Sequence, residues 1–239
     1  ELPADWEGSG RWPETTDPEL TWEMRKKLAA KGWLTMHWPE EYGGQNASPV
    51  RSAIFNEEMA YLRAPGRDTF GVKMLAPTLM IHGTEEQKQT HLAPVARGEI
   101  QWCQGYSEPE SGSDLASLAT RAVKDGDEYV ICGEKKWTTN GGVADLYTVF
   151  CVTDPTSKSR RISAIIVEKG TPGFEVKKVE DKMGIRCVPV VETHFDNVRV
   201  PKGNLIGGRP GLGFKHAMMT LDYARPGVAA QAMGAAQGA

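Results

Sequence analysis

The spacing of apolar residues divides the chain into a helical first part, a strand-rich middle and a helical end. In the first hundred residues, apolar side chains recur every three or four positions, as Leu20, Met24 and Leu28 do, which places them on one face of a helix. After Gly98 they gather in short segments rich in β-branched and aromatic residues, which favour strands. The helical spacing returns from Gly213 onward.

Capping residues predict where the first helices begin and end. Asp17-Pro18-Glu19 combines a cap, a proline suited to the first helical position and an acid, and Gly32 ends that helix. Thr84 and Gln87 have the spacing of a capping box, which opens a helix that ends at Gly98. Further helices are predicted over 49–63 and over 70–82, the second interrupted by Pro77.

Strands without intervening helices predict the fold class of the middle region. A hairpin turn over 124–127 joins two of them, and the absence of alternating strands and helices excludes a doubly wound dinucleotide fold. The class is α+β, with an N-terminal helical domain (1–99), a middle antiparallel β-barrel or sandwich (100–208) and the start of a C-terminal helical bundle (209–239). The predicted strands are Gln101–Ser107, Thr120–Val123, Glu128–Cys132, Leu146–Val152, Ile162–Glu168, Phe174–Val179 and Glu192–Val200.

Composition narrows the range of functions. The 239 residues are 40% hydrophobic and 25% charged, with a formal net charge of −3, which argues against a general nucleic-acid binder. No apolar run has the length of a membrane helix. The four cysteines lack metal-ligand spacing and are interpreted as free core thiols of a reducing compartment: Cys103, Cys132, Cys151 and Cys187.

Both ends of the chain indicate a piece of a longer protein. The sequence begins with Glu1 and ends inside an Ala-rich helical pattern at Ala239. Arg225-Pro226 is expected to kink or restart that last helix. The glycine-rich stretch 208–213 lacks the spacing of a phosphate loop, so we interpret it as a flexible turn into the helix.

Two segments carry the candidate chemistry. In 104–114 a predicted strand leads into a loop of small residues, whose amides and hydroxyls could cradle a phosphate or a ring edge. In 136–142 a strand ends with Trp137, two threonines and Asn-Gly-Gly, a pattern that could flank a planar cofactor. Taken singly, each segment could equally be a turn, with Trp137 in the core. Each of the five histidines stands alone in the sequence, which favours structural or surface roles.

Taken together, the segments resemble the acyl-CoA dehydrogenase family. Ser107-Glu108-Pro109-Glu110-Ser111-Gly112-Ser113-Asp114 is followed by Trp137-Thr138-Thr139-Asn140-Gly141-Gly142 and Asp181-Lys182-Met183-Gly184-Ile185-Arg186, and then by Leu221-Asp222-Tyr223-Ala224-Arg225-Pro226. This order and spacing cover nearly the whole chain. Glu110 departs from the glycine usual in the family, which places a negative charge in the loop unless it points to solvent.

The resemblance implies a site for FAD and an acyl-CoA thioester. Ser107 would hydrogen-bond the flavin edge, Trp137 would shield one end of the ring, and Thr139 would donate toward flavin N5. Ser113 would lie at the border of the FAD and CoA sites, and Glu108 would have a structural role in its turn. The implied cofactor-binding residues are Gln104, Tyr106, Ser107, Gly112, Ser113, Trp137, Thr138 and Thr139, and the implied substrate-binding residues are Ser113, Asp222, Tyr223 and Arg225.

The resemblance also implies a reaction and its partners. A carboxylate removes the α proton of the thioester while the β hydrogen leaves as hydride, which yields a trans-2-enoyl-CoA. Ala224 occupies a position where a minority of the family carries the glutamate base, so the base is expected after residue 239 and this piece alone is expected to be inactive. Electrons would pass to an electron-transferring flavoprotein. A homo- or hetero-tetramer in the bacterial cytoplasm or the mitochondrial matrix is expected.

Two other functions stay open at this point. An acyl-CoA oxidase or a flavin monooxygenase of the same fold would let the reduced flavin meet oxygen. A non-catalytic subunit that binds flavin or CoA would need no base at all.

Overall fold

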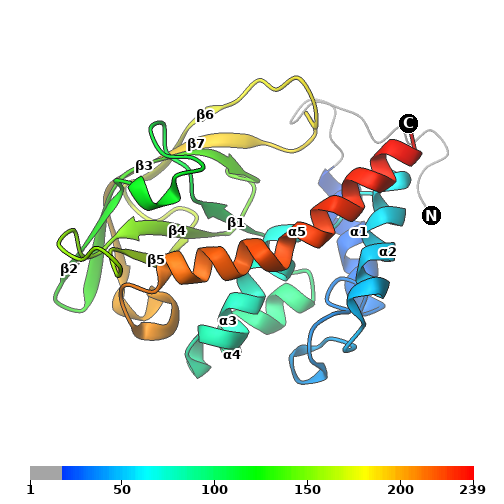
Figure 1. Ribbon diagram of the computed structural model, residues 1–239, viewed down its shortest axis with the longest axis horizontal. Coiled ribbons are helices and arrows are strands. Elements are labelled where there is room, and N and C mark those ends of the chain that lie inside the picture. The colour runs from blue at the N-terminus through cyan, green and yellow to red at the C-terminus, as the bar shows by residue number, and fades with distance from the viewer. Residues whose placement is uncertain (1–17) are drawn as a thin grey trace.

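A computed structural model describes residues 18–239 (Figure 1). Helices gather on one side of the molecule and a curled sheet on the other, and a long last helix joins the two sides. The expected cap at Asp17 lies outside the described residues. The helices are α1 (Pro18–Ala30), α2 (Pro49–Tyr61), a π-helix (Phe70–Leu75), α3 (Ala76–His82), α4 (Glu85–Ala96) and α5 (Gly213–Gln237).

The predicted caps form as expected. The Thr84 hydroxyl accepts from the Gln87 amide at 3.2 Å, and the Gln87 side chain accepts from the Thr84 amide at the same distance, so α4 begins with a capping box. Gly32 and Gly98 take left-handed backbone conformations just after α1 and α4, which glycine adopts without a steric penalty. The Gln87 amide also donates to the carbonyls of Gly203 and Leu205, which ties α4 to the region after the sheet.

The prediction for Pro77 was wrong in its detail. The helix is continuous through this proline, because Pro77 lies in the first turn of α3, where a missing N–H removes no helical hydrogen bond. The irregularity comes earlier, as the π-helix Phe70–Leu75. A π-turn inserts one residue per turn and occurs frequently at functional sites.

The middle region is a seven-stranded curled sheet, and the α+β fold class is confirmed. Its strands follow the order β1-β4-β2-β3-β7-β6, with β5 paired to β4. The prediction of a wholly antiparallel sheet needs one correction, since β1 and β2 each pair with β4 in parallel. The strands are β1 (Trp102–Gly105), β2 (Arg121–Asp125), β3 (Glu128–Thr139), β4 (Leu146–Val152), β5 (Ile162–Glu168), β6 (Phe174–Val179) and β7 (Val190–Pro201).

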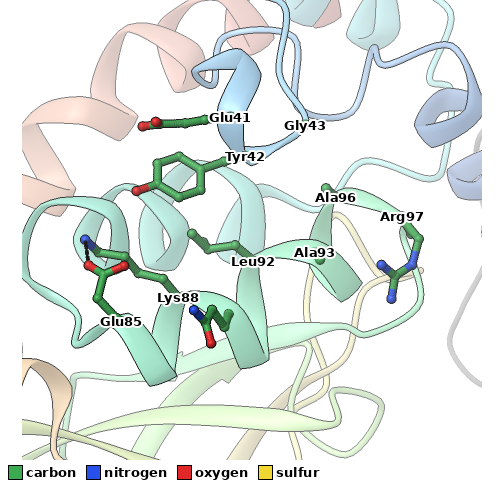
Figure 2. A pocket seen from close by; sticks show the side chains of 10 residues that line it. Glu41, Tyr42, Gly43, Glu85, Lys88, Leu92, Ala93, Ala96 and Arg97 are labelled. Carbon is green, nitrogen blue, oxygen red and sulfur yellow. Dashed lines mark hydrogen bonds and ion pairs between the residues drawn. The ribbon is translucent and has the colours of Figure 1, made fainter.

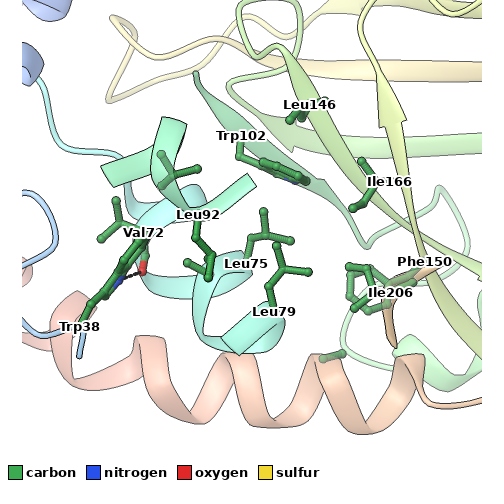
Figure 3. Close-up of a cluster of buried hydrophobic side chains, with 14 of the residues drawn as sticks. Trp38, Val72, Leu75, Leu79, Leu92, Trp102, Leu146, Phe150, Ile166 and Ile206 are labelled. Atoms are coloured by element: carbon green, nitrogen blue, oxygen red, sulfur yellow. Dashed lines mark hydrogen bonds between the residues drawn. The ribbon is translucent and has the colours of Figure 1, made fainter. Parts of the chain in front are cut away.

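Two apolar clusters form the core. One lies between the helices and the sheet and includes Leu79, Phe150 and Ile206 (Figure 3). Its two buried tryptophans each satisfy the indole N–H, Trp38 on the Val72 carbonyl at 2.9 Å and Trp102 on the Thr148 hydroxyl at 2.8 Å. The second cluster fills the inner face of the sheet.

The stretch before α5 is a packed junction, which corrects the expectation of a flexible turn. The Gly211 amide donates to the Ser163 hydroxyl at 2.8 Å, and a Cβ at Gly213 would come within 2.6 Å of the Ser163 backbone on β5. Helix α5 then continues through Pro226 as one helix. Arg225-Pro226 was expected to kink or restart this helix, and the expectation of a restart was wrong. Its far end reaches α2, where a Cβ at Gly234 would lie 2.1 Å from the Glu57 carbonyl oxygen.

The cysteines are free, but they do not all belong to the core. Cys103 and Cys151 are buried, whereas Cys132 is exposed and Cys187 is partly exposed. The interpretation of all four as core thiols was therefore wrong for two of them. Among residues 18–239, no helix combines the length and the apolar character needed to cross a bilayer.

Candidate functional site

The two segments that carry the candidate chemistry lie side by side in the structure. Strand β1 delivers the loop that begins at Tyr106, and β3 delivers Lys136 and Trp137. The Lys136 amide donates to the Ser107 carbonyl at 2.8 Å, which joins the segments directly. Segments about thirty residues apart in the chain therefore form one local structure.

A buried ion pair holds this junction. The Lys135 ammonium donates to the Glu108 carboxylate at 2.7 Å and to the Tyr106 carbonyl at 3.1 Å. The same carboxylate accepts from the Ala119 and Thr120 amides at 2.7 and 2.9 Å. Burial opposes the charged form, but Lys135 and these donors outweigh it and hold the pKa of Glu108 below its usual value. Glu108 thus has the structural role expected of it.

Trp137 occupies an unusual conformation for a bulky residue. The pairing of β3 with β7 shifts register between Lys135 and Thr138, and Trp137 sits in this bulge with a φ of 61°. Its side chain is 55% exposed, and the Lys136 ammonium lies 5.0 Å from the ring centroid. A bulge re-aims a side chain, and here it presents a large aromatic ring to the outside of the sheet.

Three buried polar atoms near this junction lack a hydrogen-bond partner within the described chain. They are Gln104 Oε1, the Tyr106 hydroxyl and Thr138 Oγ1. The Tyr106 ring stacks on Phe150 with centroids 4.3 Å apart, and burial raises the pKa of its hydroxyl. Native interiors satisfy nearly all such groups, so each of these atoms is a candidate for contact with a bound group or an ordered water. The Tyr106 hydroxyl also faces Thr220 on α5.

The other predicted site residues of the two segments are accessible. Ser107 and Thr139 are partly exposed, and Gly112 and Ser113 are exposed in the loop after Glu108. Glu110 is also exposed, so its charge is solvated. The loop is held by a backbone exchange between Glu108 and Ser111 at 2.7 and 3.1 Å.

The predicted substrate residues lie apart from these segments, on α5. Asp222 and Arg225 are exposed and form an ion pair with each other one turn apart, and Tyr223 is 63% exposed. Within the described residues, no hydrogen bond or ion pair links them to the two loops. Ala224 lies between Tyr223 and Arg225 in the sequence and is only 7% exposed, so the solvent-facing side of this turn is formed by its neighbours.

A shallow pocket elsewhere contains none of the predicted residues. It has a volume of about 430 Å³ and lies between the 3-10 helix Glu40–Tyr42 and α4 (Figure 2). Tyr42 and Leu92 face each other across it, and Lys88 at its rim is paired with Glu85 at 2.8 Å. Its two cations, Lys88 and Arg97, are each paired with a neighbouring glutamate, and we assign the pocket no role.

A histidine pair escaped the sequence analysis. His82 on α3 and His216 on α5 stack with centroids 4.6 Å apart, although 134 positions separate them in the sequence. Burial, followed by the charges of His82 and Lys215, lowers the pKa of His216 to about 4. Both residues follow helical spacing, which gives no indication of a partner in another helix.

Helices before and after a curled sheet, with a small-residue loop beside an exposed tryptophan, define a three-part helix–sheet–helix protein. The chain belongs to the acyl-CoA dehydrogenase family. The family's N-terminal domain matches residues 5–99, and its middle domain matches residues 103–198.

Named relatives agree with this membership. The chain is 43% identical to a probable acyl-CoA dehydrogenase, fadE25, of Mycobacterium leprae over 99% of its own length and 59% of that protein's. It is also 43% identical to a short-chain-specific acyl-CoA dehydrogenase of Clostridium acetobutylicum, over 91% and 58%. The structure of butyryl-CoA dehydrogenase from Megasphaera elsdenii is similar with a TM-score of 0.81 at 36% identity, over 93% and 58%. The chain thus spans a little over half the length of these relatives.

Proposed function

We propose that the protein of which this chain is part is an FAD-dependent acyl-CoA dehydrogenase that converts an acyl-CoA thioester to a trans-2-enoyl-CoA. The observation that carries the proposal is the junction of the two loops. It combines accessible hydroxyls, a tryptophan presented by a bulge and buried polar atoms without partners. Family membership supports the reaction class.

The donor set of the junction fits a flavin. An isoalloxazine ring has a polar edge and apolar faces, and the junction offers amides and hydroxyls beside an exposed aromatic side chain. The unpartnered Gln104 Oε1 and Thr138 Oγ1 are compatible with contacts to such an edge. Once bound, FAD would supply the hydride acceptor.

In this proposal the residues of the chain bind and orient. Ser107 and Thr139 donate hydrogen bonds to the flavin edge, Trp137 shields one end of the ring, and backbone groups of Tyr106 contact the same edge. Gly112 leaves the loop open for the close approach of a phosphate, and Ser113 lies between the cofactor and the thioester. On α5, Asp222, Tyr223 and Arg225 make polar contacts to the acyl-CoA.

The base for the α proton lies outside the described chain in this proposal. Glu108 is already engaged by Lys135 and two amides, which leaves it unsuited to proton abstraction. Ala224 has no carboxylate, so the base comes from residues after 239. The α proton is weakly acidic, so hydrogen bonds to the thioester carbonyl and the exclusion of water are also required.

The remaining proposals concern the domain boundaries, the electron acceptor, the oligomeric state and the cellular compartment. The domain boundaries 1–99, 100–208 and 209–239 separate the helical part, the sheet and the start of a helical bundle. Electrons leave to an electron-transferring flavoprotein, and the subunits form a homo- or hetero-tetramer. The bacterial cytoplasm or the mitochondrial matrix is the site of action.

The visible spectrum of the full-length protein tests the proposal. Anaerobic addition of acyl-CoA thioesters is expected to bleach a flavin band, and the enoyl product is measured by chromatography. Peroxide formation in air would instead indicate an oxidase. A flavin band that no thioester bleaches would point to an accessory subunit or a monooxygenase, and the absence of a band after FAD addition would rule out the cofactor assignment.

A further inference from the structure

Arg67 and Lys73 form a pair of cations for which the described residues supply no counterion. Arg67 lies before the π-helix and Lys73 lies within it, and both side chains are half-buried. In the part of the chain that the structure describes, neither forms a hydrogen bond or an ion pair. The nearby Asp68 is turned into the interior, where its carboxylate accepts from the Gly71 amide at 3.0 Å and faces Arg25.

Helix α5 leaves space for the Lys73 ammonium. A Cβ at Gly227 would lie 2.9 Å from Lys73 Nζ, so a side chain at this position would collide with the ammonium. The Asn56 amide nitrogen would lie 3.9 Å from the same Cβ position, and it donates to the Ser52 carbonyl at 2.5 Å. The Lys73 ammonium therefore lies against the backbone of α5 at Gly227.

The surroundings of the pair are positively charged. Burial, followed by the charge of Arg67, lowers the pKa of Lys73 to about 8. Burial and then Lys73 in turn lower the pKa of His37 to about 4. Among residues 18–239, no carboxylate shifts the pKa of Lys73 or His37. Half-buried charges of one sign are costly unless an opposite charge accompanies them.

The position of the pair relates it to the proposed substrate residues. Gly227 follows Ala224 by three residues, so the two lie on the same face of α5 in successive turns. Asp222, Tyr223 and Arg225 occupy the turn before. An acyl group that runs along the face shared by Ala224 and Gly227 would bring its distal end toward Lys73.

We propose that Arg67 and Lys73 form a carboxylate-binding site for the distal end of the acyl group, so that the substrate class is the mono-CoA thioester of a dicarboxylic acid. This inference rests on the proposed function. The π-helix adds weight to it, because it places Lys73 toward α5 and because such turns occur frequently at functional sites.

The test compares two thioesters of equal chain length on the full-length protein, one ending in a methyl group and one in a carboxylate. The readouts are the ratio of their kcat/KM values and the ratio of their Kd values by calorimetry. A charged hydrogen bond contributes enough to favour the carboxylate by roughly 10- to 100-fold. Lys73→Gln is expected to remove this preference, Lys73→Arg to retain it, and Lys26→Gln, an exposed cation on α1, to leave the ratio unchanged.

Equal kcat/KM values and equal Kd values for the two thioesters in the wild type would overturn the proposed carboxylate site. So would an unchanged preference in Lys73→Gln together with a lowered melting temperature, since the counterion would then be a carboxylate from residues after 239. If no thioester of either kind bleaches the flavin, the proposed function itself fails. Methyl-ended thioesters that react without a carboxylate preference overturn the inference alone.

Discussion

The ammonium of Lys135 lies 2.7 Å from the carboxylate of Glu108, and both side chains are almost wholly excluded from solvent. This pair connects the loop after β1 to β3, and the two amides that also donate to Glu108 complete its hydrogen bonding. The candidate site is built directly over this contact, so its geometry depends on a buried charge pair.

Glu108→Gln is expected to destabilise the protein by about 3–5 kcal/mol, because the Lys135 charge would be left buried without compensation. Urea unfolding of the full-length protein measures the change. Asp127→Asn, which breaks the exposed pair with Lys202, serves as the control and is expected to change the stability far less. Equal costs for the two variants would contradict the importance of burial.

Trp137→Gly is expected to separate cofactor binding from stability. A left-handed backbone costs a non-glycine residue about 1–2 kcal/mol, so the flavin-free variant should be as stable as the wild type or more so. The loss of the aromatic contact should raise the Kd for FAD about 10-fold. Fluorescence titration with FAD and a thermal melt provide the two readouts, with Trp137→Phe as the variant that retains a ring. Unchanged FAD affinity in Trp137→Gly would remove Trp137 from the site.

The stacked histidines predict a loss of stability in mild acid. The pKa of His216 is about 4 in the folded protein against about 6.5 in the unfolded chain, so its contribution is present above pH 6.5 and is lost as the pH falls toward 4. Between pH 7 and pH 5 this amounts to about 2 kcal/mol. His216→Phe keeps a ring against His82 and is expected to remove that component of the pH dependence. Urea unfolding of both proteins at pH 7 and pH 5 measures this component. Equal pH dependence of stability in the variant and the wild type would refute the role of His216.

Gly234→Ala tests the contact between α5 and α2. A Cβ at Gly234 would lie 2.1 Å from the Glu57 carbonyl oxygen, so the helices would have to separate. Overpacking of this kind costs about 1–3 kcal/mol. Gly203→Ala is the matched control, since a Cβ there has no neighbour within 4 Å. A difference below the error of thermal unfolding would show that the two helices are not held closely together.

Local pattern was sufficient for several elements of the fold. Strands β4, β5 and β6 have the predicted bounds, because β4 and β5 are apolar, β-branched runs and β6 alternates apolar and charged residues before ending in Val179. Strand β3 was predicted to end at Cys132, but it continues to Thr139. The charged residues Glu134, Lys135 and Lys136 concealed this continuation, since sequence pattern does not show that one of them is neutralised by a partner 27 residues away.

Long-range relationships account for the rest. The parallel pairing of β1 with β4 depends on the path of the chain through the sheet, and strand composition carries no record of it. The Tyr106–Phe150 stack, the His82–His216 stack and the convergence of Lys73 on Gly227 likewise join distant segments. In contrast, both candidate loops could be identified from the sequence because each concentrates small residues, hydroxyls or an aromatic in a few positions.

The contact between α2 and α5 has a consequence for synthesis on the ribosome. Helix α2 is complete at Tyr61, and the residues of α5 that cover it are translated about 170 residues later. At cellular translation rates this delay is roughly 10–30 s, during which α2 lacks its partner. Helix α2 therefore emerges early and acquires its packing partner late, and in that interval its uncovered face is available to a chaperone.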